Sequence, residues 1–232
     1  MTRPPRLYKY RSLAEAAFKY TEQIFLRDEI YFSPLGSLND PFEGRHHQFI
    51  HSMNDPVMLD PVVQEMMGDI YRRAQESAAR IVAGVGVLSL SEKPDESVMW
   101  SHYADEHRGI CLEFDGSNLG TLFDDARRVD YSDSTPFIDV TGDPSSLELA
   151  KLICLSKASQ WQYEKEWRVL SPVAGVKPFP SATLTGVILG ARISADHRRC
   201  VRDWLAQRSP QPQILQAELE DRNYGLGIHP AY

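Results

Sequence analysis

Short segments rich in β-branched and aromatic residues, several of them alternating between apolar and polar positions, predict β-strands. They cover residues 7–11, 29–32, 84–91, 108–114, 127–131, 160–170, 184–190, 214–219 and 224–228. The last two are close together in the chain and are predicted to form a hairpin.

Other segments carry apolar residues at every third or fourth position, which predicts amphipathic helices. Helices are expected over residues 13–25, 61–83, 145–159 and 196–207, with a short one opening near Pro94. Ser12, followed by Glu15, is expected to cap the first helix. The mixed order of strands and helices predicts one α+β domain over residues 1–232, with a mixed or antiparallel sheet and a helical insertion at about residues 46–83.

The segment 160–170 places two carboxylates and an arginine on one face if it is extended, because Glu164, Glu166 and Arg168 are then same-side neighbours. Glutamate is depleted in strands, and nearby carboxylates raise each other's pKa. The pattern is typical of an acid/base or cation-stabilising pair. It is equally typical of a polar strand face on which Arg168 pairs with one glutamate. Both interpretations stay open.

Three further segments carry polar or aromatic residues that suit either a structural role or ligand contact. Residues 34–44 are rich in turn formers, and Asn39 or Asp40 is expected to bond its own backbone or to touch a ligand. Ser89 and Ser91 share one strand face, which meets either solvent or a cleft. The short helix after Pro94 brings Trp100 and Tyr103 to one face, as core residues or as a platform for a ring.

Charge and composition exclude several function classes. With 25 Lys+Arg against 32 Asp+Glu the net charge is −7, which does not favour non-specific binding to nucleic acid or anionic membranes. No apolar run is long enough to span a membrane, and the three cysteines lack metal-like spacing, so we expect reduced thiols in a cytoplasmic protein.

The basic and histidine-rich segments give weaker signals. The most basic local cluster is a solvated helix face or a phosphate site, and it consists of Arg192, Arg198, Arg199 and Arg202. His46, His47 and His51 have no metal-ligand spacing, so no metal is expected. Walker, Gly-x-Gly-x-x-Gly, Gly-x-Ser-x-Gly and His-Glu-x-x-His motifs are absent from the sequence.

Four segments together resemble a bacterial domain family of unknown function, the family numbered twenty-nine seventy-one. They are residues 7–11, residues 32–43, residues 89–109 with their Ser-Leu-Ser and Trp-Ser-His-Tyr-Ala motifs, and residues 161–168. That family carries no established activity, so the resemblance by itself implies no reaction.

The order of three motifs also resembles ADP-ribosyltransferases of the arginine, serine, glutamate type. The motifs are a basic residue in the first strand (Arg11 or Lys9), Ser-x-Ser in a middle strand (Ser89 and Ser91), and Glu-x-Glu in a late strand (Glu164 and Glu166). The resemblance implies a split sheet with a cleft between two small sheets, in which NAD is bound as the substrate.

The resemblance also implies a role for each motif. Arg11 or Lys9 would contact the phosphates of NAD, and the two serines would support the nicotinamide side. Glu166 would hold the ribose 2′-hydroxyl, and Glu164 would assist the nucleophile. Breaking the bond to nicotinamide develops positive charge on the ribose, and a fixed carboxylate lowers that barrier. The other residues expected at the NAD site are Tyr10, Asn39, Trp100, Tyr103 and Arg168.

The sequence therefore predicts an NAD-dependent ADP-ribosyltransferase or NAD glycohydrolase, a toxin or phage-defence effector in the bacterial setting. The acceptor is a protein, a nucleic acid, a small molecule or water. Two alternatives stay open: a non-catalytic interaction or sensing domain of the same fold, and a nucleic-acid-processing protein that uses the arginine cluster.

Overall fold

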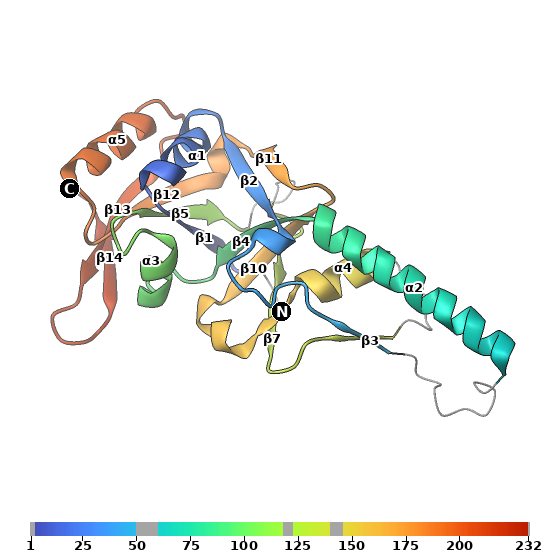
Figure 1. Cartoon of the computed structure of the whole chain (residues 1–232). Coiled ribbons are helices and arrows are strands. Elements are labelled where there is room, and N and C mark those ends of the chain that lie inside the picture. Colours follow the sequence, from blue (N-terminus) through green and yellow to red (C-terminus); the bar gives the residue numbers. More distant parts are fainter. Residues whose placement is uncertain (1–2, 50–59, 118–122, 140–145, 232) are drawn as a thin grey trace.

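A ten-stranded sheet runs through the computed structural model, which describes residues 3–49, 60–117, 123–139 and 146–231 (Figure 1). Eight of its strands form one path in the order β11-β2-β4-β1-β5-β12-β13-β14, while β10 joins this path at β4 and β6 pairs with β10. β12 and β13 pair in parallel, whereas β1, β4, β5 and β10 pair antiparallel with their neighbours, so the sheet is mixed. The strands are β1 (Arg6–Arg11), β2 (Glu29–Pro34), β4 (Gly86–Ser91), β5 (Ile110–Asp115), β6 (Arg127–Arg128), β10 (Glu166–Ser171), β11 (Gly175–Pro178), β12 (Leu184–Leu189), β13 (Gln213–Leu219) and β14 (Leu226–Pro230).

Strand β4 has different neighbours at its two ends, and this opens a fork in the sheet. On one edge, β10 pairs with β4 along its whole length. On the other edge, β1 pairs with β4 at Ser91, whereas β2 pairs with Gly86 and Val87. Residues 88–90 have no strand partner on that second edge among the described strands. The middle of β4 is therefore open to a cleft between β1 and β2.

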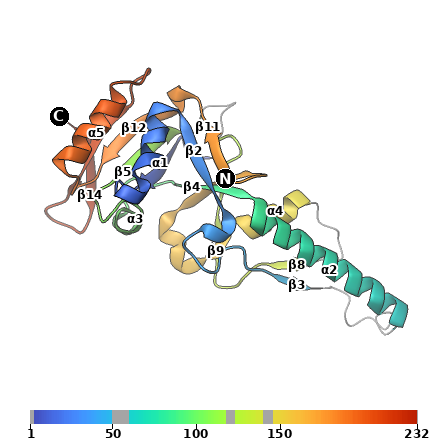
Figure 2. The ribbon, with the colours of Figure 1, turned by 45° about the horizontal axis from the view of Figure 1, so that its top comes forward.

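Most of the helices lie at the two ends of the sheet, whereas α3 packs against β1 in its middle. In both views α1 and α5 lie together at one end, and α2 projects from the other end with α4 at its base (Figures 1 and 2). Beside α2, β3 (His47–Phe49) pairs with β8 (Phe137–Asp139). The helices are α1 (Glu15–Leu26), α2 (Pro61–Gly84), α3 (Ser97–Tyr103), α4 (Ser146–Cys154) and α5 (Ala195–Leu205), with short 3₁₀ helices η1 (Leu35–Ser37), η3 (Ser159–Glu164) and η4 (Ser181–Thr183).

Alternating side chains of β1 pack into two different hydrophobic cores, one on each face of the strand. Leu7 packs into the larger core with residues of β2, β4, β5, β12 and α5. Tyr8 and Tyr10 point the other way, into a smaller core with Trp100. A third cluster joins α2 and α4 to the sheet through Val87. The two faces of β1 and β4 are thus fixed by burial, which also fixes the side chains that face the fork.

The predicted α+β class and mixed sheet are confirmed, as are the helix over residues 61–83 and the C-terminal hairpin of β13 and β14. Residues 50–59 of the expected insertion lie outside the described residues. Ser12 is not the cap of α1, because the helix begins at Glu15 with Ala14 in the N-cap position. The predicted strand at 127–131 is in fact two strands, β6 and β7 (Asp130–Ser132).

Two corrections concern the segment with the paired glutamates. Residues 160–164 are not extended, because they belong to the 3₁₀ helix η3, and β10 begins only at Glu166. Lys165, which lies between η3 and β10, has a left-handed backbone conformation, with φ of 46°. The helix predicted to reach residue 159 ends at Cys154, and β9 (Ser156–Ala158) follows it and pairs with β7. Glu164 and Glu166 therefore reach the same place from two different elements.

Candidate functional site

A cavity of about 390 Å³ lies in the fork beside β4. Its walls come from β1, β2, β4, α3, β9, η3 and β10 and from the loop that follows η1. This volume lies within the range of ligand pockets in proteins. A larger, more open groove of about 740 Å³ runs beside α2, but its described lining contains neither a carboxylate nor a lysine or arginine. Of these two cavities, the fork is therefore the one that brings carboxylates, lysines and arginines together.

Nearly all the residues expected at the NAD site line this one cavity: Lys9, Tyr10, Arg11, Asn39, Ser89, Ser91, Tyr103, Glu164, Glu166 and Arg168. Trp100 is not among the lining residues. Its side chain is fully buried, and its indole N–H donates to the carbonyl of Pro94 at 2.8 Å. Its ring packs edge-on against Tyr10 at 5.3 Å between centroids. Trp100 therefore supports a wall of the cavity from behind.

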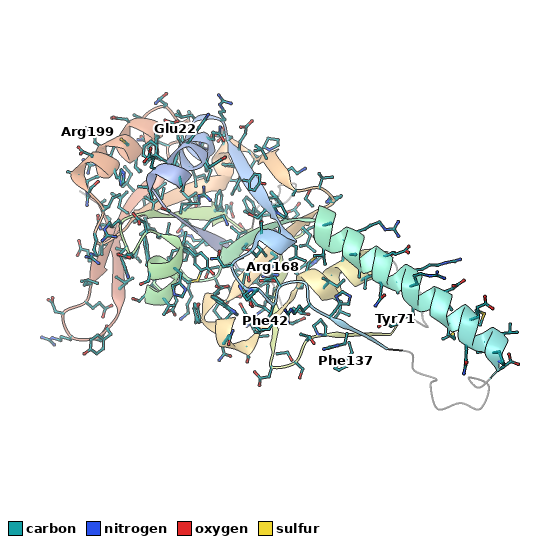
Figure 3. All side chains as sticks on the ribbon, viewed as in Figure 1. Glu22, Phe42, Tyr71, Phe137, Arg168 and Arg199 are labelled. Atoms are coloured by element: carbon teal, nitrogen blue, oxygen red, sulfur yellow. The ribbon has the colours of Figure 1, made fainter. Side chains whose placement is uncertain are left out.

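Arg168, labelled in Figure 3, belongs to the cavity lining, and its side chain is fully buried. Its Nε donates to Oε1 of Glu166 at 2.8 Å, and its Nη1 donates to Oε2 of Glu43 at 2.9 Å and to the carbonyl of Cys154 at 2.6 Å. Its Nη2 donates to Glu43 and, at 3.0 Å, to Glu166. The ion pair expected for Arg168 thus forms with Glu166 and also with Glu43, which the sequence pattern did not indicate.

Lys157, on β9, neutralises the second carboxylate. Its ammonium donates to Glu164 and, at 3.0 Å, to Oε2 of Glu166, and it lies 3.8 Å from Oε1 of Glu43. The ammonium also lies 5.0 Å from the ring centroid of Trp161, in a cation–π contact. Sequence reasoning missed Lys157 because it placed this residue within a helix expected to run to residue 159, whereas the helix ends at Cys154 and Lys157 lies on β9.

The two site glutamates have opposite pKa shifts although both are buried. Burial alone would raise the pKa of Glu166, but the charges of Arg168 and Lys157 outweigh it and lower the pKa to about 2. Burial raises the pKa of Glu164, and the nearby Lys157 only partly opposes this. The hydroxyl of Tyr103 donates to Oε1 of Glu164 at 2.7 Å. One carboxylate is therefore held ionised, and its neighbour more readily takes a proton.

The opposite wall carries two cations that lack an acidic partner. Lys9 donates to the carbonyl of Ser89 at 2.9 Å, and Nε of Arg11 donates to the hydroxyl of Thr21 at 3.3 Å. Neither forms an ion pair with a described carboxylate, and both are partly exposed. Burial, with the neighbouring charge of Arg11, lowers the pKa of Lys9 to about 8. The charges of Glu166 and Glu164 act on the pKa of Lys9 in the opposite sense, so this wall presents positive charge that lies close to the two glutamates without a direct ion pair to them.

The remaining polar residues position the carboxylates and the loop. Ser91 donates from its hydroxyl to the carbonyl of Glu164 at 2.6 Å, and the Ser89 hydroxyl helps to lower the pKa of Glu166. The side chain of Asn39 bonds the hydroxyl of Tyr103. The turn predicted nearby is confirmed at Asp40, whose carboxylate accepts from the backbone N–H of Phe42 at 2.9 Å. The hydroxyl of Tyr10 donates a hydrogen bond to the carbonyl of Lys93 at 2.7 Å, and Lys93 lies outside the cavity lining.

The other candidate chemistries find little support in the described residues. They hold no group of three or more His, Cys, Asp or Glu side chains arranged for a metal, and His51 lies outside them. Within the arginine cluster, Arg198 bonds Gln216 and Arg199 pairs with Asp196. Figure 3 shows Arg199 on α5, away from Arg168. A helix long and apolar enough to cross a membrane is not found in the same part of the chain.

Comparison with known proteins gives one partial match. Neither the curated proteins nor the solved structures include a significant match to this chain, so they lend no support to the ADP-ribosyltransferase resemblance. Residues 99–169, which include Tyr103, Lys157, Glu164, Glu166 and Arg168 of the cavity, match the model of a family described as "Protein of unknown function (DUF2971)".

Proposed function

We propose that this protein binds NAD in the fork beside β4 and cleaves its bond to nicotinamide, as an NAD glycohydrolase or an ADP-ribosyltransferase. The observation that carries the proposal is one cavity that holds unpaired cations on one wall and two adjacent glutamates on the other. NAD has the matching charge distribution, with phosphates at its middle and a positively charged nicotinamide ring at one end.

The phosphates are assigned to the wall of β1. Lys9 and Arg11 are the cations of the cavity without a carboxylate partner among the described residues. Ammonium and guanidinium groups in partly desolvated positions bind phosphate oxygens through charge-assisted hydrogen bonds. The nicotinamide ribose then extends toward β10, where Glu166 and Glu164 lie.

The chemical step needs a fixed negative charge close to the ribose. The bond between C1′ and the ring nitrogen breaks, and its electron pair stays on the nitrogen, which neutralises the ring. Positive charge develops on C1′ and the ring oxygen of the ribose, and an ionised carboxylate stabilises it. Glu166 suits this role, because its pKa is lowered to about 2 and it is ionised at neutral pH.

Glu164 is assigned the proton of the incoming nucleophile. The acceptor hydroxyl, amine or water attacks C1′ and releases a proton, which the carboxylate takes up as a general base. A carboxylate with a raised pKa accepts a proton more readily than an ordinary one, and burial raises the pKa of Glu164. Its carboxyl is oriented by the hydroxyl of Tyr103 at 2.7 Å.

The test is release of nicotinamide from labelled NAD by the wild type and by Glu166→Gln. We expect the variant to lose about a hundredfold or more of the rate, the size of one lost electrostatic contact to the transition state. Glu113→Gln is a matched control, because Glu113 is also a buried, ion-paired sheet glutamate but lies outside the cavity lining. Absence of release by the wild type, with no rise of melting temperature in NAD, would overturn the proposal.

A second candidate is a binding module of the same fold that holds NAD without cleaving it. It is favoured by the hydrogen bonds that both carboxylates make within the chain, since Lys157 bonds Glu164 and Glu166 and Arg168 bonds Glu166. For such a module, NAD would raise the melting temperature without release of nicotinamide. The same two measurements therefore separate the two candidates.

A further inference from the structure

The carboxylate end of the cavity already contains a cation, the ammonium of Lys157. It bonds Glu164, reaches Glu166 at 3.0 Å and lies 5.0 Å from the ring centroid of Trp161. Carboxylates and an aromatic ring together are the surroundings that bind organic cations in proteins. In this structure these surroundings are filled by a side chain of the protein itself.

Lys157 can leave this position at a smaller cost than Arg168. The guanidinium of Arg168 makes its hydrogen bonds to Glu43, Glu166 and the carbonyl of Cys154 and ties three segments together. Lys157 has a flexible four-carbon stem, and its strand β9 pairs with β7 outside the ten-stranded sheet. When the ammonium withdraws, Glu166 keeps its pair with Arg168.

We infer that Lys157 is a built-in competitor for the positively charged end of the ligand: its ammonium holds the place of the nicotinamide ring and is displaced when that ring enters. The inference rests on the proposed function. It also supplies a step for release of the product. Cleavage leaves the electron pair on the ring nitrogen and makes nicotinamide neutral, so the ring no longer competes with the ammonium, which returns to the two carboxylates.

The test compares two ligands that differ in the positive ring. One is carba-NAD, in which a methylene group replaces the ribose ring oxygen, so that the ring stays positive and the bond is not cleaved. The other is ADP-ribose, which has the same phosphates and no positive ring. Affinities are measured by calorimetry for the wild type, Lys157→Met and Lys157→Arg.

In Lys157→Met the affinity for carba-NAD relative to that for ADP-ribose should rise by about tenfold, the size of one charge-assisted hydrogen bond between ammonium and carboxylate. Lys157→Arg keeps the cation and should keep the wild-type ratio. A lysine with a purely structural role would weaken both ligands equally. An unchanged or lowered ratio in Lys157→Met would therefore overturn the inference.

A measurement on the wild type covers the case in which Lys157→Met does not fold. The ¹³Cε resonance of Lys157, assigned by its loss in Lys157→Arg, should shift on addition of carba-NAD and stay in place with ADP-ribose. Equal shifts with both ligands would contradict displacement by the ring. If the wild type binds neither ligand, the proposed function itself fails, whereas binding of both without a change of ratio or resonance removes only the role of Lys157.

Discussion

Replacement of Arg168 by leucine should be among the most damaging single changes in this protein. The guanidinium is fully buried and donates to Glu43, Glu166 and the carbonyl of Cys154. Leucine fills part of the volume but leaves the carboxylate of Glu43 with a single distant cation, the ammonium of Lys157 at 3.8 Å. Removing one partner of a buried ion pair costs about 3–5 kcal/mol of folding free energy.

Urea unfolding followed by tryptophan fluorescence measures this cost. The control is Arg6→Leu, which also removes an arginine from a glutamate, with Arg6 and Glu113 3.1 Å apart, but from a side chain that is 61% exposed. Because the guanidinium of Arg6 is largely in solvent, its loss should cost less than the loss of the fully buried Arg168, although its partner Glu113 is itself buried. An Arg168→Leu variant no less stable than Arg6→Leu would refute the view that the buried pair holds this end of the sheet together.

The pH dependence of the unfolding free energy tests the same ion pair in a second way. The pKa of Glu166 is lowered from 4.5 to about 2, so its ionisation stabilises the folded chain above pH 4.5, and this stabilisation is lost as the pH falls through about 2. In Arg168→Leu, protonation of Glu166 relieves an uncompensated buried charge. The difference in unfolding free energy between wild type and variant should therefore shrink as the pH falls. A constant difference would contradict the assignment.

Two further predictions concern the packing of Gly109 behind β1 and the charge of Lys9 in the cavity. Gly109→Ala should lower the melting temperature strongly, because a Cβ there would lie 2.2 Å from the carbonyl oxygen of Arg11, whereas Gly36→Ala, with nothing within 4 Å, should have little effect; equal melting temperatures would be inconsistent with this packing. The affinity for ADP-ribose should fall as the pH rises through about 8, because Lys9, with a pKa lowered to about 8, then loses its charge. Calorimetry on Lys9→Met should show that this decline is absent; a decline of equal size would assign it to another group.

Hydrophobic periodicity was sufficient to predict the α+β class and the sheet strands that are buried, because burial on one or both faces leaves a pattern in the sequence. It also placed Ser89 and Ser91 on one face of β4, and that face lines the cavity. It failed for residues 160–164. Their alternating pattern is that of a strand, but the chain forms a 3₁₀ helix and turns at Lys165, whose left-handed backbone no pattern of polarity reveals.

The other two members of the buried ion-pair cluster, Glu43 and Lys157, could not be predicted from a local sequence pattern for another reason. Glu43 lies 125 residues before Arg168 in the chain, and only the tertiary fold brings the two together. Lys157 lies close in sequence to both glutamates, but its direction depends on the end of α4 at Cys154, and helix ends are the least certain part of any pattern. Conversely, Trp100 had the spacing of a ring platform, and the fold uses it as core.

In the proposed function, NAD lies in the fork beside β4, between the cations of β1 and the glutamates of η3 and β10. A crystal structure of Glu166→Gln with bound NAD tests it most directly, because the variant is expected to bind NAD without cleaving it. We expect phosphates within hydrogen-bond distance of Lys9 and Arg11, and C1′ of the nicotinamide ribose beside residue 166. NAD bound elsewhere, or with its nicotinamide end at Lys9 and Arg11, would contradict it.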